Sequence, residues 1–223
     1  MKNQFAVLIP AYNAEGTISD VLRIIAANGW AAEVVVIDDG SLDETAKKAG
    51  ELGATVISHE RNRGKGAALT TGFRWILDNK EVDAVVTVDA DLQHDIRDLT
   101  KFIDARNKSG ANIVLGRRKR LGSGMPLSRI LSNSITSLLV SARTGMFIPD
   151  SQCGYRLIGR EVLENIVVES EGFEAETELL IRAAGHGFHI ASVPVQTVYR
   201  GETSHMTHWT TTKRFIRTLL KEY

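Results

Sequence analysis

The chain has 223 residues, of which 43% are hydrophobic, and this is enough for one sizeable α/β domain. Lys plus Arg and Asp plus Glu both number 27, so the formal net charge of zero excludes a bulk attraction for nucleic acid or an acidic membrane. A single cysteine, Cys153, excludes an internal disulfide framework, and no run reaches the ~18 consecutive apolar residues of a transmembrane helix. Because the N-terminus does not resemble a signal peptide either, we expect a cytoplasmic protein.

Short apolar runs alternate with helical patterns over the first half of the chain, which is typical of βαβ units and a mainly parallel sheet. The predicted strands cover residues 5–10, 33–41, 54–60, 83–89 and 111–118. The predicted helices cover residues 17–29, 41–53, 64–79 and 95–110. We therefore expect residues 1–117 to form one continuous wound sheet.

The pattern changes from about residue 118. A basic, glycine-rich stretch (118–126) precedes a long amphipathic segment (127–143), and the tail (213–223) interleaves basic and apolar residues. The elements predicted between them are a turn, short strand and helix at 150–166, a helix at 172–187 and a last strand at 189–200. The two amphipathic segments are either core-packing helices or interfacial helices that rest on lipid.

Acidic side chains follow two of the predicted parallel strands. Asp38 and Asp39 end the strand VVVIDDGS, and Asp89 and Asp91 end VTVDADLQ. Because ligands bind at the carboxyl ends of strands in an open parallel sheet, we expect these acids to face one crevice. In the alternative interpretation, Asp39 and Asp89 only cap helices or accept hydrogen bonds from loop amides.

Asp89, Asp91 and Gln93 alternate along the chain. An extended backbone would turn them to one side and offer two carboxylates and an amide oxygen to a hard divalent cation. Mg²⁺ or Mn²⁺ prefers few protein oxygens together with phosphate oxygens of a substrate, so the pattern indicates a metal-diphosphate site. The chain has no GxxxxGK[ST] sequence and no GxGxxG after the first strand, so metal and side chains must hold the diphosphate.

Nine motifs occur in order along the chain. They are IPAYNAEGTI, VIDDGSLDET, NRGKGAAL, VDADLQHD, VLGRR, SRILSN, DSQCGYRL, GFEAETELL and VPVQTVYRGETSH. In this order they resemble the large inverting, nucleotide-sugar-dependent glycosyltransferase family with the glycosyltransferase A-type fold. Within it, the chain looks most like the dolichyl- or polyprenyl-phosphate mannosyl- and glucosyltransferases. The resemblance extends from about residue 5 to 208 and implies a Rossmann-like, mainly parallel sheet flanked by helices in a single catalytic domain, residues 1–223.

The resemblance implies that residues 1–117 form a nucleotide-sugar-binding half. The residues that would surround the nucleotide are Pro10, Tyr12, Glu15, Asp38, Asp39 and Lys65. The residues that would contact the metal or the sugar-diphosphate are Asp89, Ala90, Asp91, Gln93 and Arg200. Of these, Asp89, Asp91 and Gln93 would hold the metal.

Residues 118–223 would form the acceptor-binding half, together with the end of the preceding strand. Arg117, Arg129 and Ser132 match positions that receive the acceptor's phosphate, and the planar fork of guanidinium suits a phosphate dianion. The alternative is a solvated basic loop. Glu176 lies where relatives that glycosylate hydroxyl groups have an acceptor-activating acid. A phosphate monoester is already largely ionised near neutral pH, so Glu176 is either a general base or a positioning group.

Three further side chains have structural interpretations. Glu174 and Glu178 flank Glu176, and we expect them on a solvated helix face. Nothing near Cys153 identifies a histidine partner, so a small buried thiol is expected rather than a nucleophile.

We therefore predict a metal-dependent enzyme that transfers a sugar with inversion from a nucleoside-diphosphate sugar, such as UDP-glucose or GDP-mannose, to a polyprenyl or dolichyl phosphate. The motif DSQCGYR resembles the glucosyl-type version and favours a UDP-linked donor. The cofactor would be Mg²⁺ or Mn²⁺, and the enzyme would meet the cytoplasmic face of a membrane peripherally, with no nucleic acid partner. The alternatives are transfer to a saccharide or other hydroxyl acceptor with Glu176 as base, and a nucleotide-sugar-binding module without turnover.

Overall fold

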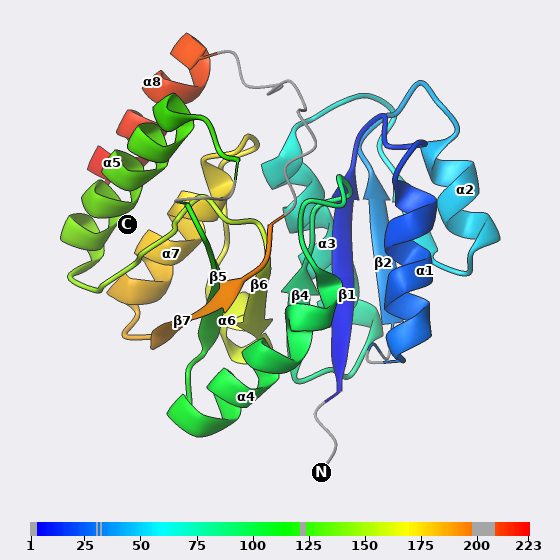
Figure 1. The fold of residues 1–223 in the computed structure, drawn as a ribbon, viewed down its shortest axis with the longest axis horizontal. Coiled ribbons are helices and arrows are strands. Elements are labelled where there is room, and N and C mark those ends of the chain that lie inside the picture. The colour runs from blue at the N-terminus through cyan, green and yellow to red at the C-terminus, as the bar shows by residue number, and fades with distance from the viewer. Residues whose placement is uncertain (1–3, 30, 32, 121–123, 198–207) are drawn as a thin grey trace.

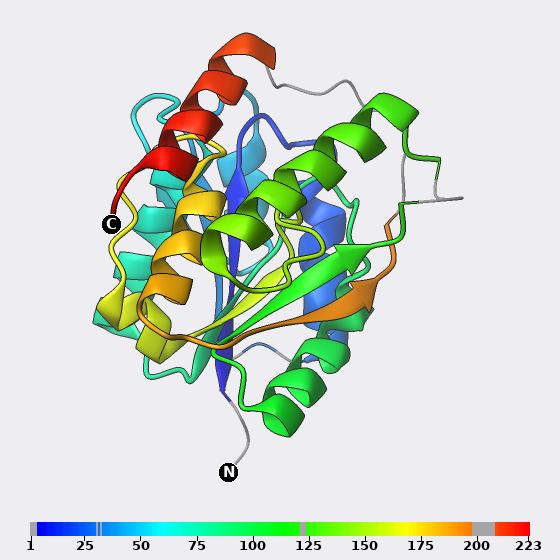
Figure 2. The same cartoon turned by 90° about the vertical axis from the view of Figure 1, so that its left-hand side faces the viewer.

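The computed structural model describes residues 4–29, 31, 33–120, 124–197 and 208–223, which form a seven-stranded sheet covered by helices on both faces (Figures 1 and 2). The strands are β1 (Phe5–Ala11), β2 (Glu33–Asp38), β3 (Thr55–Ser58), β4 (Ala84–Thr87), β5 (Ile113–Arg118), β6 (Arg156–Gly159) and β7 (Ile190–Val195). The helices are α1 (Ile18–Asn28), α2 (Thr45–Glu51), α3 (Lys65–Asn79), α4 (Leu99–Ser109), α5 (Leu127–Thr144), α6 (Arg160–Asn165), α7 (Ala175–Gly185) and α8 (His208–Leu220). A short 3₁₀-helix, η1 (Ile96–Asp98), precedes α4.

The strand order in the sheet is β3-β2-β1-β4-β6-β5-β7. The neighbouring pairs are parallel except where β6 lies, because β6 runs antiparallel to both β4 and β5. The prediction of a mainly parallel α/β sheet is confirmed. The prediction of one continuous sheet over residues 1–117 is wrong, because Leu157 of β6 lies between Val86 of β4 and Val114 of β5.

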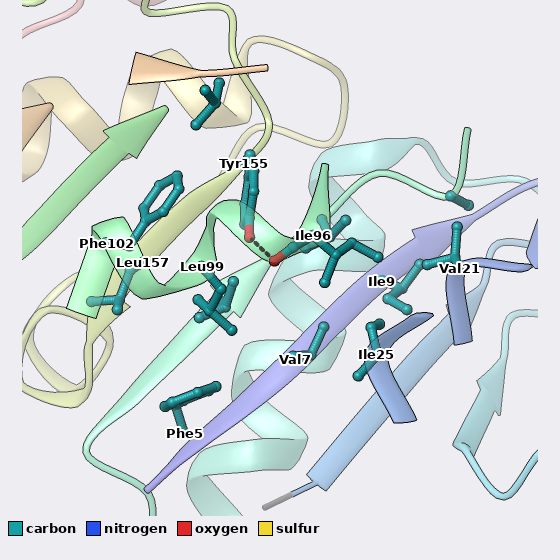
Figure 3. Close-up of a cluster of buried hydrophobic side chains, with 14 of the residues drawn as sticks. Phe5, Val7, Ile9, Val21, Ile25, Ile96, Leu99, Phe102, Tyr155 and Leu157 are labelled. Atoms are coloured by element: carbon teal, nitrogen blue, oxygen red, sulfur yellow. Dashed lines mark hydrogen bonds between the residues drawn. The ribbon is translucent and has the colours of Figure 1, made fainter. Parts of the chain in front are cut away.

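Alternating side chains of the central strands fill two cores. Phe5, Val7 and Ile9 of β1 face α1, η1 and α4, and Figure 3 shows them with Leu99 and Phe102. Ala6 and Leu8 of β1 face the opposite way, toward α3, α6 and α7. This period of two is what a strand buried on both faces requires.

The predicted boundaries shift where turns hold the chain. Helix α2 begins at Thr45 instead of residue 41, because Ser41 and Asp43 act as turn residues. The Ser41 hydroxyl accepts a hydrogen bond from Asn13 N at 2.9 Å, and Asp43 Oδ1 accepts one from Thr45 N at 3.0 Å. The loop after β1 is thereby tied to the loop after β2, at the edge of the sheet where the acids lie.

The amphipathic segments 127–143 and 213–223 coincide with most of α5 and with the end of α8. Helix α5 packs inward through Ser137 and Val140, and Arg143 Nε donates to the Leu219 carbonyl of α8 at 3.1 Å. The outer side of α5 is apolar: Leu131 and Leu138 are 63% and 68% exposed. Over the described ranges, no helix is both long enough and apolar enough to cross a membrane.

Candidate active site

The carboxyl ends of β1, β2, β4 and β5 lie at one edge of the sheet, since β1, β2 and β4 are parallel and β6 runs antiparallel to both β4 and β5. Asp38 ends β2, Asp89 follows β4 by two residues, and Arg117 lies near the end of β5. The fold thus brings candidates for donor and acceptor binding to the same edge, where open α/β sheets bind ligands.

Lys65, the first residue of α3, joins two of the candidate acids. Its Nζ lies 2.6 Å from Asp89 Oδ1 and 3.1 Å from Glu176 Oε2. Burial alone would lower the pKa of Lys65 and raise that of Asp89, but the attraction between these charges outweighs it and shifts both pKa values the other way. Gly154 leaves room for this cluster, because a Cβ there would lie 2.5 Å from Asp89 Oδ2 and 2.8 Å from Lys65 Nζ. Lys65 and Asp89 therefore face each other as a partly buried ion pair.

Arg156, in β6, is buried behind Glu176. Its guanidinium donates to the carbonyl oxygens of Ser151, Cys153 and Glu176 at 2.7–2.8 Å, and Nη2 lies 3.7 Å from Glu176 Oε1. The sequence did not identify this role, since the motif DSQCGYRL alone does not show which backbone the arginine meets. The prediction for Cys153 is confirmed, because its thiol is buried and burial raises its pKa to about 12.

The predicted metal ligands come from one tight turn after β4. Leu92 has a φ of +58°, and Gln93 N donates to Asp91 Oδ1 at 2.9 Å, so the backbone over 89–93 is folded and the predicted extended conformation is wrong. The turn carries two carboxylates and a primary amide, hard oxygen donors that fit Mg²⁺ or Mn²⁺. Within the described parts of the chain, no group of three or more His, Cys, Asp or Glu side chains is placed to hold a metal ion.

His94 is a neighbour of Asp89 that the sequence did not single out. Its Nε2 lies 3.6 Å from Asp89 Oδ2, and its ring centroid lies 5.5 Å from that of Tyr155. Tyr155 in turn donates its hydroxyl hydrogen to the Ile96 carbonyl at 3.0 Å, as Figure 3 shows. The buried Nδ1 of His94 has no hydrogen-bond partner among the described residues. The turn that carries Asp89 is therefore packed through two aromatic rings against the residue that precedes β6.

Asp39 is buried and organises the loop before Lys65. Its carboxylate accepts hydrogen bonds from the backbone amides of Arg63 at 3.0 Å and Gly64 at 2.8 Å, and Oδ1 lies 2.6 Å from His59 Nδ1. These contacts match the alternative interpretation of Asp39 as an acceptor for loop amides. Its contact with a nucleotide stays a prediction.

The other donor-site candidates lie nearby, around the ends of β1 and β2. Asp38 is buried and accepts a hydrogen bond from Ser41 N at 3.3 Å. Pro10 is half-buried in β1, whereas Tyr12 and Glu15 are exposed on the loop that follows, with 46% of Tyr12 accessible. This arrangement leaves an aromatic ring and a carboxylate open to a ligand beside the buried acids.

The acceptor-site candidates surround the connection from β5 to α5. Arg117 is exposed at the end of β5, Arg129 is half-buried in the first turn of α5, and Ser132 is exposed on the next turn. Arg200 lies outside the described residues. The acceptor-phosphate roles stay predictions.

Glu174 and Glu178 differ from expectation, since both are buried. Glu178 accepts hydrogen bonds from the backbone amides of Glu169 and Ser170 at 3.0 and 2.9 Å and from Arg182 Nε at 2.7 Å. The predicted solvated face is wrong because the loop before α7 folds over this side of the helix.

The comparisons with known proteins agree with this arrangement. The model of glycosyl transferase family 2 matches residues 6–167. The chain is 36% identical over 205 residues to the dolichyl-phosphate hexose transferase of Haloferax volcanii, covering 90% of this chain and 86% of the relative. It is 29% identical over 215 residues to the UDP-N-acetylglucosamine–dolichyl-phosphate N-acetylglucosaminyltransferase of Methanococcus voltae, covering 86% and 85%.

Among solved structures, glucosyl-3-phosphoglycerate synthase from Mycobacterium tuberculosis, crystallised with Mn²⁺, UDP-glucose and phosphoglyceric acid, matches with a TM-score of 0.79 and 26% identity. The match covers 98% of this chain and 79% of that chain. The fold, the family match and these relatives define a nucleotide-sugar-dependent glycosyltransferase with the A-type fold. The chain belongs to glycosyl transferase family 2.

Proposed function

We propose that this glycosyltransferase moves a sugar from a nucleoside-diphosphate sugar to a polyprenyl phosphate, with inversion at the anomeric carbon and with Mg²⁺ or Mn²⁺ as cofactor. The names of the relatives support a dolichyl-phosphate type of acceptor, and the solved structure with Mn²⁺ and UDP-glucose supports a metal and a UDP-linked donor. UDP-glucose and GDP-mannose remain the donors to compare.

The observation that carries the proposal is the apolar outer side of α5, directly beyond the acceptor-site arginines. We call it the α5 apolar face and define it by its exposed residues, Leu127, Leu131, Ile135, Leu138 and Leu139. Helix α8 meets the last turn of α5 through Arg143, which donates to the Leu219 carbonyl, and α8 carries exposed Ile216 and Leu220 with exposed basic side chains. An apolar helix side mixed with cations suits the surface of a lipid bilayer, where a polyprenyl chain would reside. The protein would therefore act as a peripheral enzyme at the cytoplasmic face of a membrane.

In this proposal, different residues of the chain bind the metal ion and the acceptor phosphate. A bound divalent cation would neutralise charge on the departing diphosphate, and Asp89, Asp91 and Gln93 would hold it. Arg117 and Arg129 would clamp the acceptor's phosphate and aim an oxygen at the anomeric carbon. Since that oxygen is already ionised near neutral pH, no side chain has to remove a proton from it.

A hydroxyl acceptor is the second candidate, because Glu176 lies within the same cluster as Asp89. In that case Glu176 would act as general base, and Glu176→Gln would abolish transfer while nucleotide binding persisted. In the phosphate-acceptor case, Glu176→Gln would reduce transfer only by disturbing Lys65.

The test is sugar transfer to a short polyprenyl phosphate in detergent, with Mg²⁺ or Mn²⁺, compared across UDP-glucose, UDP-N-acetylglucosamine and GDP-mannose. A metal-dependent lipid-linked product from one donor would support the proposal and identify the sugar. Binding of donors without lipid product from any of them would reject the polyprenyl acceptor and direct the search to hydroxyl acceptors.

A further inference from the structure

A positive charge already occupies the predicted metal ligand Asp89. Lys65 Nζ lies 2.6 Å from Asp89 Oδ1, and the Lys65 and Asp89 side chains are only 15% and 25% exposed. His94 Nε2 lies 3.6 Å from the other carboxylate oxygen. Gly154 lies so close that a Cβ there would be 2.5 Å from Asp89 Oδ2. A metal ion that binds Asp89 in the absence of a nucleotide must therefore share this carboxylate with an ammonium group or displace that group.

Four charged groups around Lys65 balance one another without a metal. Asp89 and Glu176 carry the negative charges, and Lys65 and Arg156 carry the positive ones, with Arg156 Nη2 3.7 Å from Glu176 Oε1. A divalent cation would add two positive charges to this poorly solvated cluster, where charge repulsion is stronger than in water. A nucleoside diphosphate would bring negative charge to the same place and offer Lys65 new partners.

We propose that Lys65 is the internal counter-cation of Asp89 in the ligand-free protein and makes divalent metal binding depend on the nucleotide diphosphate. With both ligands bound, Lys65 keeps Glu176 and pairs with diphosphate oxygens, so the cluster stays balanced. This inference rests on the metal site of the proposed function. By linkage, the nucleotide and the metal raise each other's affinity by the same factor.

The test measures Mn²⁺ binding from the electron paramagnetic resonance signal of free Mn²⁺, with and without UDP and without any acceptor. For the natural protein, we expect UDP to tighten Mn²⁺ binding by about tenfold or more, within the range of coupled sites. Lys65→Met should bind Mn²⁺ alone about tenfold more tightly than the natural protein, and UDP should add less. Lys65→Arg, which keeps the charge, should retain dependence on UDP.

Two further variants keep the test decisive. Lys80→Met removes a lysine that pairs with Glu33 at 2.5 Å, at the opposite edge of the sheet from Asp89, and should leave Mn²⁺ binding unchanged. If Lys65→Met does not fold, the double variant Lys65→Met with Glu176→Gln removes one cation and one anion. Asp89 then lacks its ammonium partner while the net charge of the cluster is unchanged, so a smaller gain in Mn²⁺ affinity is expected.

The outcomes separate this inference from the proposed function. If the natural protein binds Mn²⁺ with UDP but the variants lacking Lys65 bind Mn²⁺ alone no more tightly, the counter-cation role is overturned and the metal site stands. If the natural protein binds no Mn²⁺ even with UDP, both the metal dependence and this inference are overturned.

Discussion

Arg118 and Asp150 form a two-point ion pair, with Nε and Nη2 of the guanidinium each 2.8 Å from a carboxylate oxygen. The Arg118 backbone amide also donates to Asp150, at 3.2 Å. Arg120, two residues on, donates to the Pro149 carbonyl at 2.6 Å and to Ser134 Oγ of α5 at 2.8 Å. These contacts fix the strand end that carries Arg117 against the helix that carries Arg129.

Replacing the buried member of this pair should be costly. Asp150→Asn leaves the Arg118 charge without its counter-charge in a site where the Asp150 side chain is 1% exposed. We expect the free energy of unfolding to fall by roughly 3–5 kcal/mol, the usual cost of breaking a buried pair. Urea denaturation measures it. Asp20→Asn, which disrupts the exposed pair with Arg23, is the control and should cost far less.

The same pair predicts a pH dependence of stability. Burial opposes ionisation of the Asp150 carboxyl, but the attraction of Arg118 outweighs it. The pKa of Asp150 in the folded protein is therefore below its ordinary value. The stabilisation is therefore complete above the unfolded-state pKa of about 4 and is lost as pH falls through the lower folded-state pKa. The difference in unfolding free energy between the natural protein and Asp150→Asn should be constant near neutrality and shrink below about pH 4. A constant difference down to pH 2 would contradict this origin.

Gly154→Ala should impair the site and spare the fold. Its Cβ would press on the ends of Asp89 and Lys65, at 2.5 and 2.8 Å, so these side chains must move apart. We expect kcat/KM to fall by about tenfold or more, equivalent to ~1.4 kcal/mol, in transfer assays. Gly16→Ala is the matched control, since no atom lies within 4 Å of the added Cβ. Equal activity of the two variants would reject the tight fit.

Arg117→Ala should weaken acceptor binding selectively. Loss of a charge-assisted hydrogen bond of ~1.5–3 kcal/mol predicts an increase of roughly 10–100-fold in KM for polyprenyl phosphate. The affinity for the donor nucleotide, measured by calorimetry, should not change. A parallel loss of nucleotide affinity would move Arg117 to the donor site.

The α5 apolar face gives a prediction about membranes. Leu131→Glu combined with Leu138→Glu should strongly reduce sedimentation with anionic liposomes while the melting temperature stays close to that of the natural protein, because both side chains are already largely exposed. Leu42→Glu is the control, since Leu42 is 90% exposed on the loop after β2 and should leave liposome binding unchanged. Equal binding of all three proteins would exclude α5 as the lipid-facing element.

Local patterns predicted most of the elements and the edge at which the acids lie. The face of α1 formed by Ile18, Val21, Leu22 and Ile25 is buried as its spacing predicts. Contacts between distant parts of the chain were not predictable from local sequence patterns. The sequence of β6 does not show that this strand pairs with both β4 and β5. The same limit applies to Glu178, whose partners lie in an irregular loop.

At the candidate site, too, the residue types were predictable and their contacts were not. The motifs indicated which residue types gather after β4, because ligand chemistry restricts them to oxygen donors. They did not indicate that Lys65, from a different motif, neutralises Asp89, since that depends on how α3 docks against the sheet. The left-handed backbone conformation of Leu92 was also not predictable from the sequence, because leucine rarely adopts it.

The place of β6 in the sheet has a consequence for synthesis of the protein. Strand β5 leaves the ribosome before either of the strands that flank it in the described sheet, β6 and β7. Until residues 156–159 have been made, β4 and β5 expose unpaired edges, which are prone to associate with other chains. A fragment that ends at residue 117 should therefore aggregate when expressed alone, and folding of the natural chain should be completed late, after β6 joins its two neighbours.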